Sequence, residues 1–136
     1  MPLLIQSKWF TKEEIQANPD KIYVFGDNEE RIGKGGQALA CRDEPNTIGI
    51  RTKADRFRSE ESYWYDSKLF YAHQQMVFDD FRRVQLELEL GHTVVFPADG
   101  FGTGLAKLAE NAPKTLLFIK MLTAYHVKCY DGKKID

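Results

Sequence analysis

Three short segments of this 136-residue chain carry residue types that can hold phosphates and sugars. The first runs from Pro97 to Gly104, directly after the apolar run HTVVFP, with glycine at positions 100, 102 and 104. Glycine at a strand-to-helix corner lets a partner approach the backbone closely, and successive bare N–H groups there bind anions. The segment is therefore a candidate diphosphate-binding loop, and tight packing is the alternative explanation.

The second segment follows the apolar run KIYVFG and contains Asp27 and Asn28, bracketed by glycines at 26, 33, 35 and 36. Asp27 and Asn28 could hydrogen-bond to sugar hydroxyls, while an Asx turn or a cap is the alternative. The sequence GKGGQ has no Ser or Thr in the position that a Walker loop requires, and the dinucleotide fingerprint GxGxxG is not satisfied. Kinase and dehydrogenase functions are therefore excluded.

The third segment is the end of TIGIRTK, where Arg51, Thr52 and Lys53 are followed by Arg56 and Arg58. These side chains carry enough positive charge to neutralise a diphosphate, and a solvated charged surface is the alternative explanation. The aromatic run SYWY at 62–65 follows. It could stack on a base, but anchoring a lid to the core is the favoured interpretation.

The elements that must position these segments alternate along the chain. We expect strands at 2–6, 21–26, 47–53 and 92–97, with HVKCY at 126–130 closing the sheet. Helices are expected at 11–17, 36–42 and 67–90, and from 113 onward, while 54–68 forms an ordered insertion or lid. This order predicts a mostly parallel sheet covered on both faces, so that the three segments meet at the carboxyl ends of the strands.

The amino-acid composition limits which classes of protein this chain can belong to. With 43% hydrophobic residues, residues 1–136 can form a single globular domain. The net charge of -1 disfavours a general nucleic-acid binder. Cys41 and Cys129 lack metal-site spacing, so we expect reduced thiols and no metal. The chain has neither a basic, apolar leader nor an apolar run of membrane-spanning length, which predicts a cytoplasmic protein without a membrane partner.

Two further residues with reactive side chains are expected to be structural. His73 lies near the apolar stripe of the helix at 67–90, and a hydrogen bond to Asp80 within the core is favoured over a catalytic dyad. Cys41 is better explained by packing than by reactivity.

The ordered set YVFGDNEERIGKGGQALA, IGIRTK and VFPADGFGTGLAKLAENAP resembles the macro-domain-like family, and most closely a short bacterial and phage type. The likeness spans roughly residues 21 to 120. It differs from that family in two places, because Lys34 separates Gly33 from Gly35 and Arg51 stands where relatives usually have proline. The resemblance implies a three-layer α/β/α sandwich with a mixed, mostly parallel central sheet, and a cleft for ADP-ribose or a related nucleotide.

By that resemblance, Asn28 and the glycines behind it hold the distal ribose, and the later glycine loop holds the diphosphate. The resemblance implies Gly33, Gly35, Gly36, Gly100, Phe101, Gly102, Thr103 and Gly104 as ligand-binding residues. Their positions at strand ends add Gly26, Arg51, Thr52 and Lys53. Some members of the family hydrolyse ADP-ribosyl bonds and others only bind. Hydrolysis here would use a water held near Asn28 and polarised by Asp27 or Asp99, with no metal and no cofactor.

Two alternatives from other classes remain open at this stage. The first is a non-catalytic adaptor that uses the aromatic lid Tyr63–Tyr65 as a protein-binding patch, with the glycine loops serving only for packing. The second, less favoured, is nucleic-acid binding through the cluster from Arg51 to Arg58.

Overall fold

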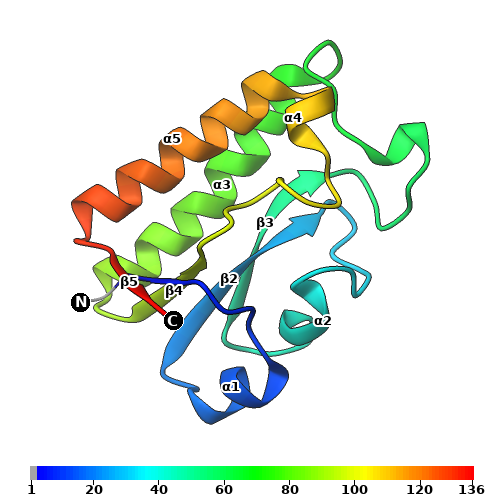
Figure 1. Ribbon diagram of the computed structural model, residues 1–136. Coiled ribbons are helices and arrows are strands. Elements are labelled where there is room, and N and C mark those ends of the chain that lie inside the picture. The colour runs from blue at the N-terminus through cyan, green and yellow to red at the C-terminus, as the bar shows by residue number, and fades with distance from the viewer. Residues whose placement is uncertain (1–2) are drawn as a thin grey trace.

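The computed structural model describes residues 3–136 and shows one five-stranded sheet between two layers of helices (Figure 1). The strands are β1 (Leu3–Gln6), β2 (Lys21–Asn28), β3 (Thr47–Lys53), β4 (Thr93–Pro97) and β5 (Lys133–Ile135), in the spatial order β3-β2-β4-β1-β5. This confirms the three-layer α/β/α fold. Pro2, which the expected first strand included, lies outside the described residues.

All pairings between these strands are parallel, so the expectation of a mixed sheet is wrong. The reason lies in the connections, because each pair of consecutive strands is joined through at least one helix. Such a crossover returns the chain to the end of the sheet from which it started, and the next strand then runs in the same direction.

The helices divide between the two faces of the sheet. Helices α3 (Phe70–Glu89), α4 (Leu108–Asn111) and α5 (Pro113–Cys129) lie on one side, and α1 (Lys12–Ala17) and α2 (Ala38–Cys41) lie on the other (Figure 1). Alternate residues of each strand supply two separate cores. In β4, Val94 and Phe96 pack in the core of α3 and α5, and Val95 packs in the core of α1 and α2. No helix among residues 3–136 is long and apolar enough to cross a membrane.

Local signals set the ends of several helices as expected. The Thr11 hydroxyl accepts a 3.0 Å hydrogen bond from the backbone N–H of Glu14 and caps α1. Gly91, with φ +89, follows the end of α3. Pro113 occupies the first turn of α5, where its missing N–H leaves no hydrogen bond unmade.

The expectation that HVKCY closes the sheet is wrong. Residues 126–129 continue α5, and the last strand begins only at Lys133. His126 is buried in this turn of α5 and packs against Phe81 of α3. The chain reverses only afterwards, at Asp131, which has φ +48, and Gly132.

The insertion between β3 and α3 is ordered and anchored by Trp64, as expected. The Trp64 indole is 1% exposed, stacks on His73 at 4.1 Å, and donates a 2.9 Å hydrogen bond to Glu29. The expected hydrogen bond between His73 and Asp80 is not made. Asp80 binds Arg31 and Arg51 instead.

Candidate functional site

A pocket of about 420 Å³ opens at the carboxyl ends of β1, β2, β3 and β4. Its volume falls within the usual range for small-molecule sites, and its place is the one where parallel sheets bind ligands. Its walls come from the residues after β1, the loop from 32 to 38, the start of the insertion after β3, and the loop from 97 to 106.

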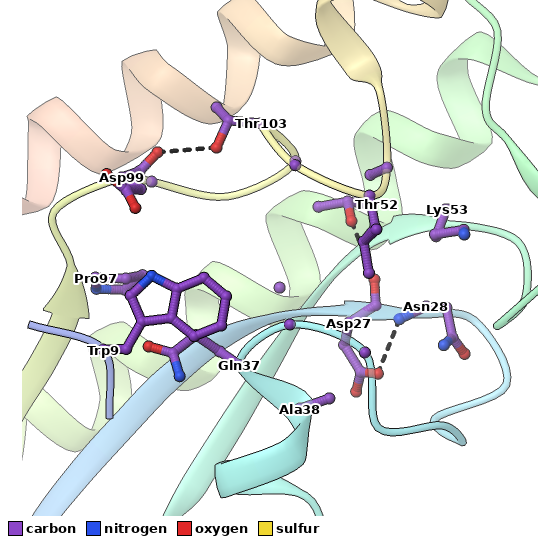
Figure 2. A pocket seen from close by; sticks show the side chains of 18 of the residues that line it. Trp9, Asp27, Asn28, Gln37, Ala38, Thr52, Lys53, Pro97, Asp99 and Thr103 are labelled. Carbon is purple, nitrogen blue, oxygen red and sulfur yellow. Dashed lines mark hydrogen bonds between the residues drawn. The ribbon is translucent and has the colours of Figure 1, made fainter. Parts of the chain in front are cut away.

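The pocket has two chemically different ends (Figure 2). The Trp9 indole stands at one side, and Asn28, Thr52 and Lys53 stand at the opposite side. The loop that carries Asp99 and Thr103 passes above, and Gln37 and Ala38 lie below (Figure 2).

All but two of the residues predicted from the sequence line this pocket. They are Gly26, Asp27, Asn28, Gly33, Gly35, Gly36, Thr52, Lys53, Asp99, Gly100, Gly102, Thr103 and Gly104. The exceptions are Arg51 and Phe101. The three separate segments therefore meet, as their places at strand ends predicted.

Arg51 does not reach the pocket. It lies on the edge strand β3, and its guanidinium donates to both carboxylate oxygens of Asp80 on α3, at 3.0 and 3.1 Å. Its backbone N–H donates to the same carboxylate at 2.8 Å. Arg51 therefore ties α3 to the sheet.

Phe101 turns into the core instead of the pocket. Its side chain is 2% exposed and packs edge-on against Phe81 and Phe96. This contact anchors the loop from 97 to 106 to the sheet, so Phe101 positions the loop and does not line the binding surface.

Two runs of backbone amides at the pocket have no partner among the described residues. Among residues 3–136, the N–H groups of 33–37 and of 101–106 donate no hydrogen bond to backbone or side chain. Both runs contain residues that line the pocket. Unpaired amides in consecutive positions form a concave, positively polarised surface that suits an anion with several oxygens, such as a diphosphate.

The glycines of these loops differ in why they lack a side chain. A Cβ on Gly35 would lie 2.7 Å from Leu105 Cδ1, and one on Gly102 would collide with Leu108. Close packing explains Gly102, because Leu108 is buried, whereas Leu105 beside Gly35 is 43% exposed and can move. A Cβ on Gly36, Gly100 or Gly104 would meet nothing within 4 Å.

Gly26 keeps the floor of the pocket open. It lies in a central strand yet is exposed, because no side chain of the loop from 97 to 106 covers it. The nearest atom to a Cβ at this position would be the Gly102 nitrogen, at 3.9 Å. A flat backbone surface of this kind accepts a ligand at close range.

Asn28 offers an unused acceptor at the far end of the pocket. Its Nδ2 donates to the carbonyl of Ile32 at 2.8 Å, which fixes the side chain, while its Oδ1 is buried and has no partner among the described residues. Buried carbonyl oxygens are normally satisfied, so this oxygen is suited to a ligand hydroxyl.

The Asp27 carboxylate already accepts hydrogen bonds on both of its oxygens. Arg42 donates to its two oxygens at 2.7 and 3.1 Å, Arg31 adds a contact at 3.2 Å, and the Asn28 N–H donates at 2.8 Å. The side chain is only 2% exposed. Asp27 thus holds the backbone at the end of β2 and is not placed to act as a base.

Asp99 and Lys53 differ strongly in exposure. Asp99 is an exposed residue at the rim, and its carbonyl accepts a 3.0 Å hydrogen bond from Thr103. Lys53 is buried, and burial is the main reason that its pKa lies below the usual value. Its Nζ donates a 2.7 Å hydrogen bond to the carbonyl of Phe57 and lies over the Tyr63 ring.

Cys41 is buried in the core that α1 and α2 form with the sheet, and burial raises the pKa of its thiol to about 12. This agrees with the packing role expected from the sequence. Among residues 3–136, no three His, Cys, Asp or Glu side chains gather closely enough to hold a metal ion.

A comparison with protein families matches residues 5–122 to a family of unknown function, DUF7831. The chain belongs to this family. No curated protein matches the chain, and no solved structure matches it. The part that matches DUF7831 includes every residue that lines the pocket, and it leaves out β5 and the last turns of α5.

Trp9 is the main pocket residue of this DUF7831 member that sequence reasoning missed. Its side chain is 62% exposed although it lines the pocket, in contrast to Trp64. The available signal was its place three residues after the strand that ends at Gln6. Trp9 was not predicted to line the pocket, because the glycine segments that pointed to a ligand follow other strands.

Proposed function

We propose that this protein binds ADP-ribose or a related nucleotide diphosphate in the pocket at the carboxyl edge of the sheet. The observation that carries the proposal is the pair of unpaired amide runs, 33–37 and 101–106, at one pocket. A diphosphate presents oxygens on both sides, so it can accept hydrogen bonds from the two loops at once.

The two ends of the pocket suit the two ends of such a ligand. The exposed Trp9 indole provides a flat aromatic surface, and stacking of one base on such a ring contributes roughly 1–3 kcal/mol. The unpartnered Oδ1 of Asn28 is an acceptor for a sugar hydroxyl at the opposite end. The order of base, diphosphate and sugar thus follows the order of groups along the pocket.

The geometry favours binding over hydrolysis. Of the three residues expected to take part in catalysis, Asp27 is engaged by two arginines and Asp99 is exposed at the rim. Asn28 can orient a hydroxyl or a water but cannot remove a proton. We therefore propose a binding protein as the primary function.

The adaptor alternative depends on an exposed aromatic patch from Tyr63 to Tyr65. Trp64 is buried against His73, and Tyr63 covers the ammonium groups of Lys53 and Lys107. These contacts use Tyr63 and Trp64 to hold the insertion in place, which leaves them less suited to contact a partner protein.

Isothermal titration calorimetry with ADP-ribose, ADP and adenosine tests the proposal. We expect ADP-ribose and ADP to bind and adenosine, which lacks the diphosphate, to bind far more weakly. Trp9 fluorescence should change on binding, and the change should vanish in Trp9→Phe, because Trp64 is the only other tryptophan and is buried. Failure of both diphosphates to bind at millimolar concentration would refute the proposed function.

A further inference from the structure

The two ends of the pocket differ in how far they are closed. At the Trp9 end, Ser7, Lys8 and Trp9 are all exposed. At the opposite end, Asn28, Thr52 and Lys53 are 7%, 3% and 7% exposed. One end is therefore open to solvent, and the other is a recess lined by buried residues.

The recess is closed by an end wall, in which residues 54–58 of the insertion pack against residues 29–33 after β2. The two segments approach so closely that a Cβ on Gly33 would lie 2.8 Å from Cβ of Arg56. Arg56 and Glu30 join the two segments directly, and contacts of Lys53 and Trp64 support one segment each. Lys53 Nζ donates to the Phe57 carbonyl at 2.7 Å, the Arg56 guanidinium lies 3.6 Å from Glu30, and Trp64 donates to Glu29 at 2.9 Å.

The position of the ligand's sugar relative to this wall decides which forms of the ligand can enter. If the base stacks on Trp9 and the diphosphate lies between the amide runs, the terminal ribose enters the recess beside Asn28. If the anomeric carbon of that ribose faces the wall, a substituent on it would collide with Arg56 and Gly33, which line the pocket. A ligand that ends in an unsubstituted ribose would fit without any displacement.

We infer that the pocket selects the free nucleotide, with an unsubstituted terminal ribose, over ADP-ribose linked to protein through that ribose. The inference rests on the proposed function and specifies its ligand class. The wall acts as a steric filter, since specificity against a related ligand is commonly obtained by a clash with the unwanted group. The base end, in contrast, tolerates additions because it is open.

The test compares ADP-ribose with two ligands that carry a group on the same anomeric carbon. These are NAD, which carries nicotinamide there, and a peptide that carries ADP-ribose on an arginine. By calorimetry or fluorescence anisotropy we expect both to bind at least about tenfold more weakly than ADP-ribose. Arg56→Gly removes the side chain that covers Gly33. It should reduce the difference in affinity between ADP-ribose and the two substituted ligands.

Arg58→Gly is the matched control, because Arg58 lies in the same segment, is exposed, does not line the pocket and makes no side-chain hydrogen bond among the described residues. It should leave the difference between ADP-ribose and NAD unchanged. Equal binding of ADP-ribose, NAD and the peptide would overturn the inference and leave the proposed function standing. If Arg56→Gly and Arg58→Gly changed the affinity difference equally, the inference would also be overturned. If ADP-ribose did not bind at all, both this inference and the proposed function would be refuted.

Discussion

Glycine serves two purposes within a few residues of the loop from Gly100 to Gly104. Gly102 is required by the fold, because its φ is +81 and a Cβ there would collide with the buried side chain of Leu108. Gly104 has neither constraint, since its φ is not in the positive region and the space beside it is open. The sequence shows three similar glycines, and only the structure separates these roles.

Gly102→Ala should destabilise the fold. We expect the free energy of unfolding to fall by roughly 2–4 kcal/mol, from overpacking against Leu108 and from the unfavourable φ. Urea denaturation measures this, with Gly104→Ala as the matched control, which should change stability by no more than about 0.5 kcal/mol. Equal stability of the two variants would contradict the assignment and would restore the idea that Gly102 is bare only for a ligand.

Gly104→Val should affect the ligand and not the fold. The side chain would project into open space beside the amides of 101–106, so ADP-ribose should bind about tenfold or more weakly at an unchanged midpoint of urea denaturation. Calorimetry on the same preparation checks the affinity. Wild-type affinity in this variant would show that the ligand does not lie against the loop.

At the scale of elements, Arg42 connects the end of α2 with β2 and with the first amide run. It follows the last residue of α2, binds both oxygens of Asp27, and donates from Nε to the carbonyl of Gly33 at 2.9 Å. One guanidinium thus fixes the strand end and the loop together. A planar group with several donors is needed for this geometry.

Arg42→Ala should lower the free energy of unfolding by about 3 kcal/mol, because it leaves the buried Asp27 carboxylate short of its main partner. Arg42→Lys should recover only part of this loss, since an ammonium cannot bind the carboxylate and Gly33 in the same way. Thermal and chemical denaturation measure both. Full recovery by lysine would mean that charge alone matters and that the fork geometry does not.

His126 makes the packing of α5 against α3 sensitive to pH. Burial lowers its pKa from 6.5, and its Nε2 has no partner among the described residues. The unfolded chain therefore binds a proton at a higher pH than the folded chain does. Stability should be full above about pH 6.5 and should fall as the pH drops through the lowered folded pKa, by up to about 1.4 kcal/mol per pH unit for this histidine.

Denaturation curves between pH 7.5 and about 5, above the range where most carboxylates titrate, measure this slope. His126→Phe should reduce this slope. His73 has a pKa lowered by the same cause, so part of the slope should remain in His126→Phe. An unchanged slope in that variant would rule out His126 as a source.

Elements were predictable where their signals are local. The Thr11 cap, the Gly91 stop and the Pro113 start each depend on neighbouring residues, and all three were expected. Contacts between distant residues were not predictable. Nothing near Arg51 in the sequence indicates that Asp80, 29 positions later, binds its guanidinium, and both residues were given other roles.

At the scale of the whole molecule, the parallel sheet explains why the predicted segments meet. Every carboxyl end lies at one edge, and β3, β2 and β4 are neighbours in the sheet, so the residues that follow them converge. The order itself could not be inferred. Because β1 lies beside β4, Trp9 reaches the loop after Pro97, and this neighbourhood completes the pocket with an aromatic surface.

The most direct test of the central claim is a nuclear magnetic resonance titration of the ¹⁵N-labelled protein with ADP-ribose. The account predicts that the largest amide shifts occur together in residues 33–37 and 101–106, as their N–H groups exchange water for phosphate oxygens. Small shifts in both runs at saturating ligand, with the largest changes elsewhere, would contradict it.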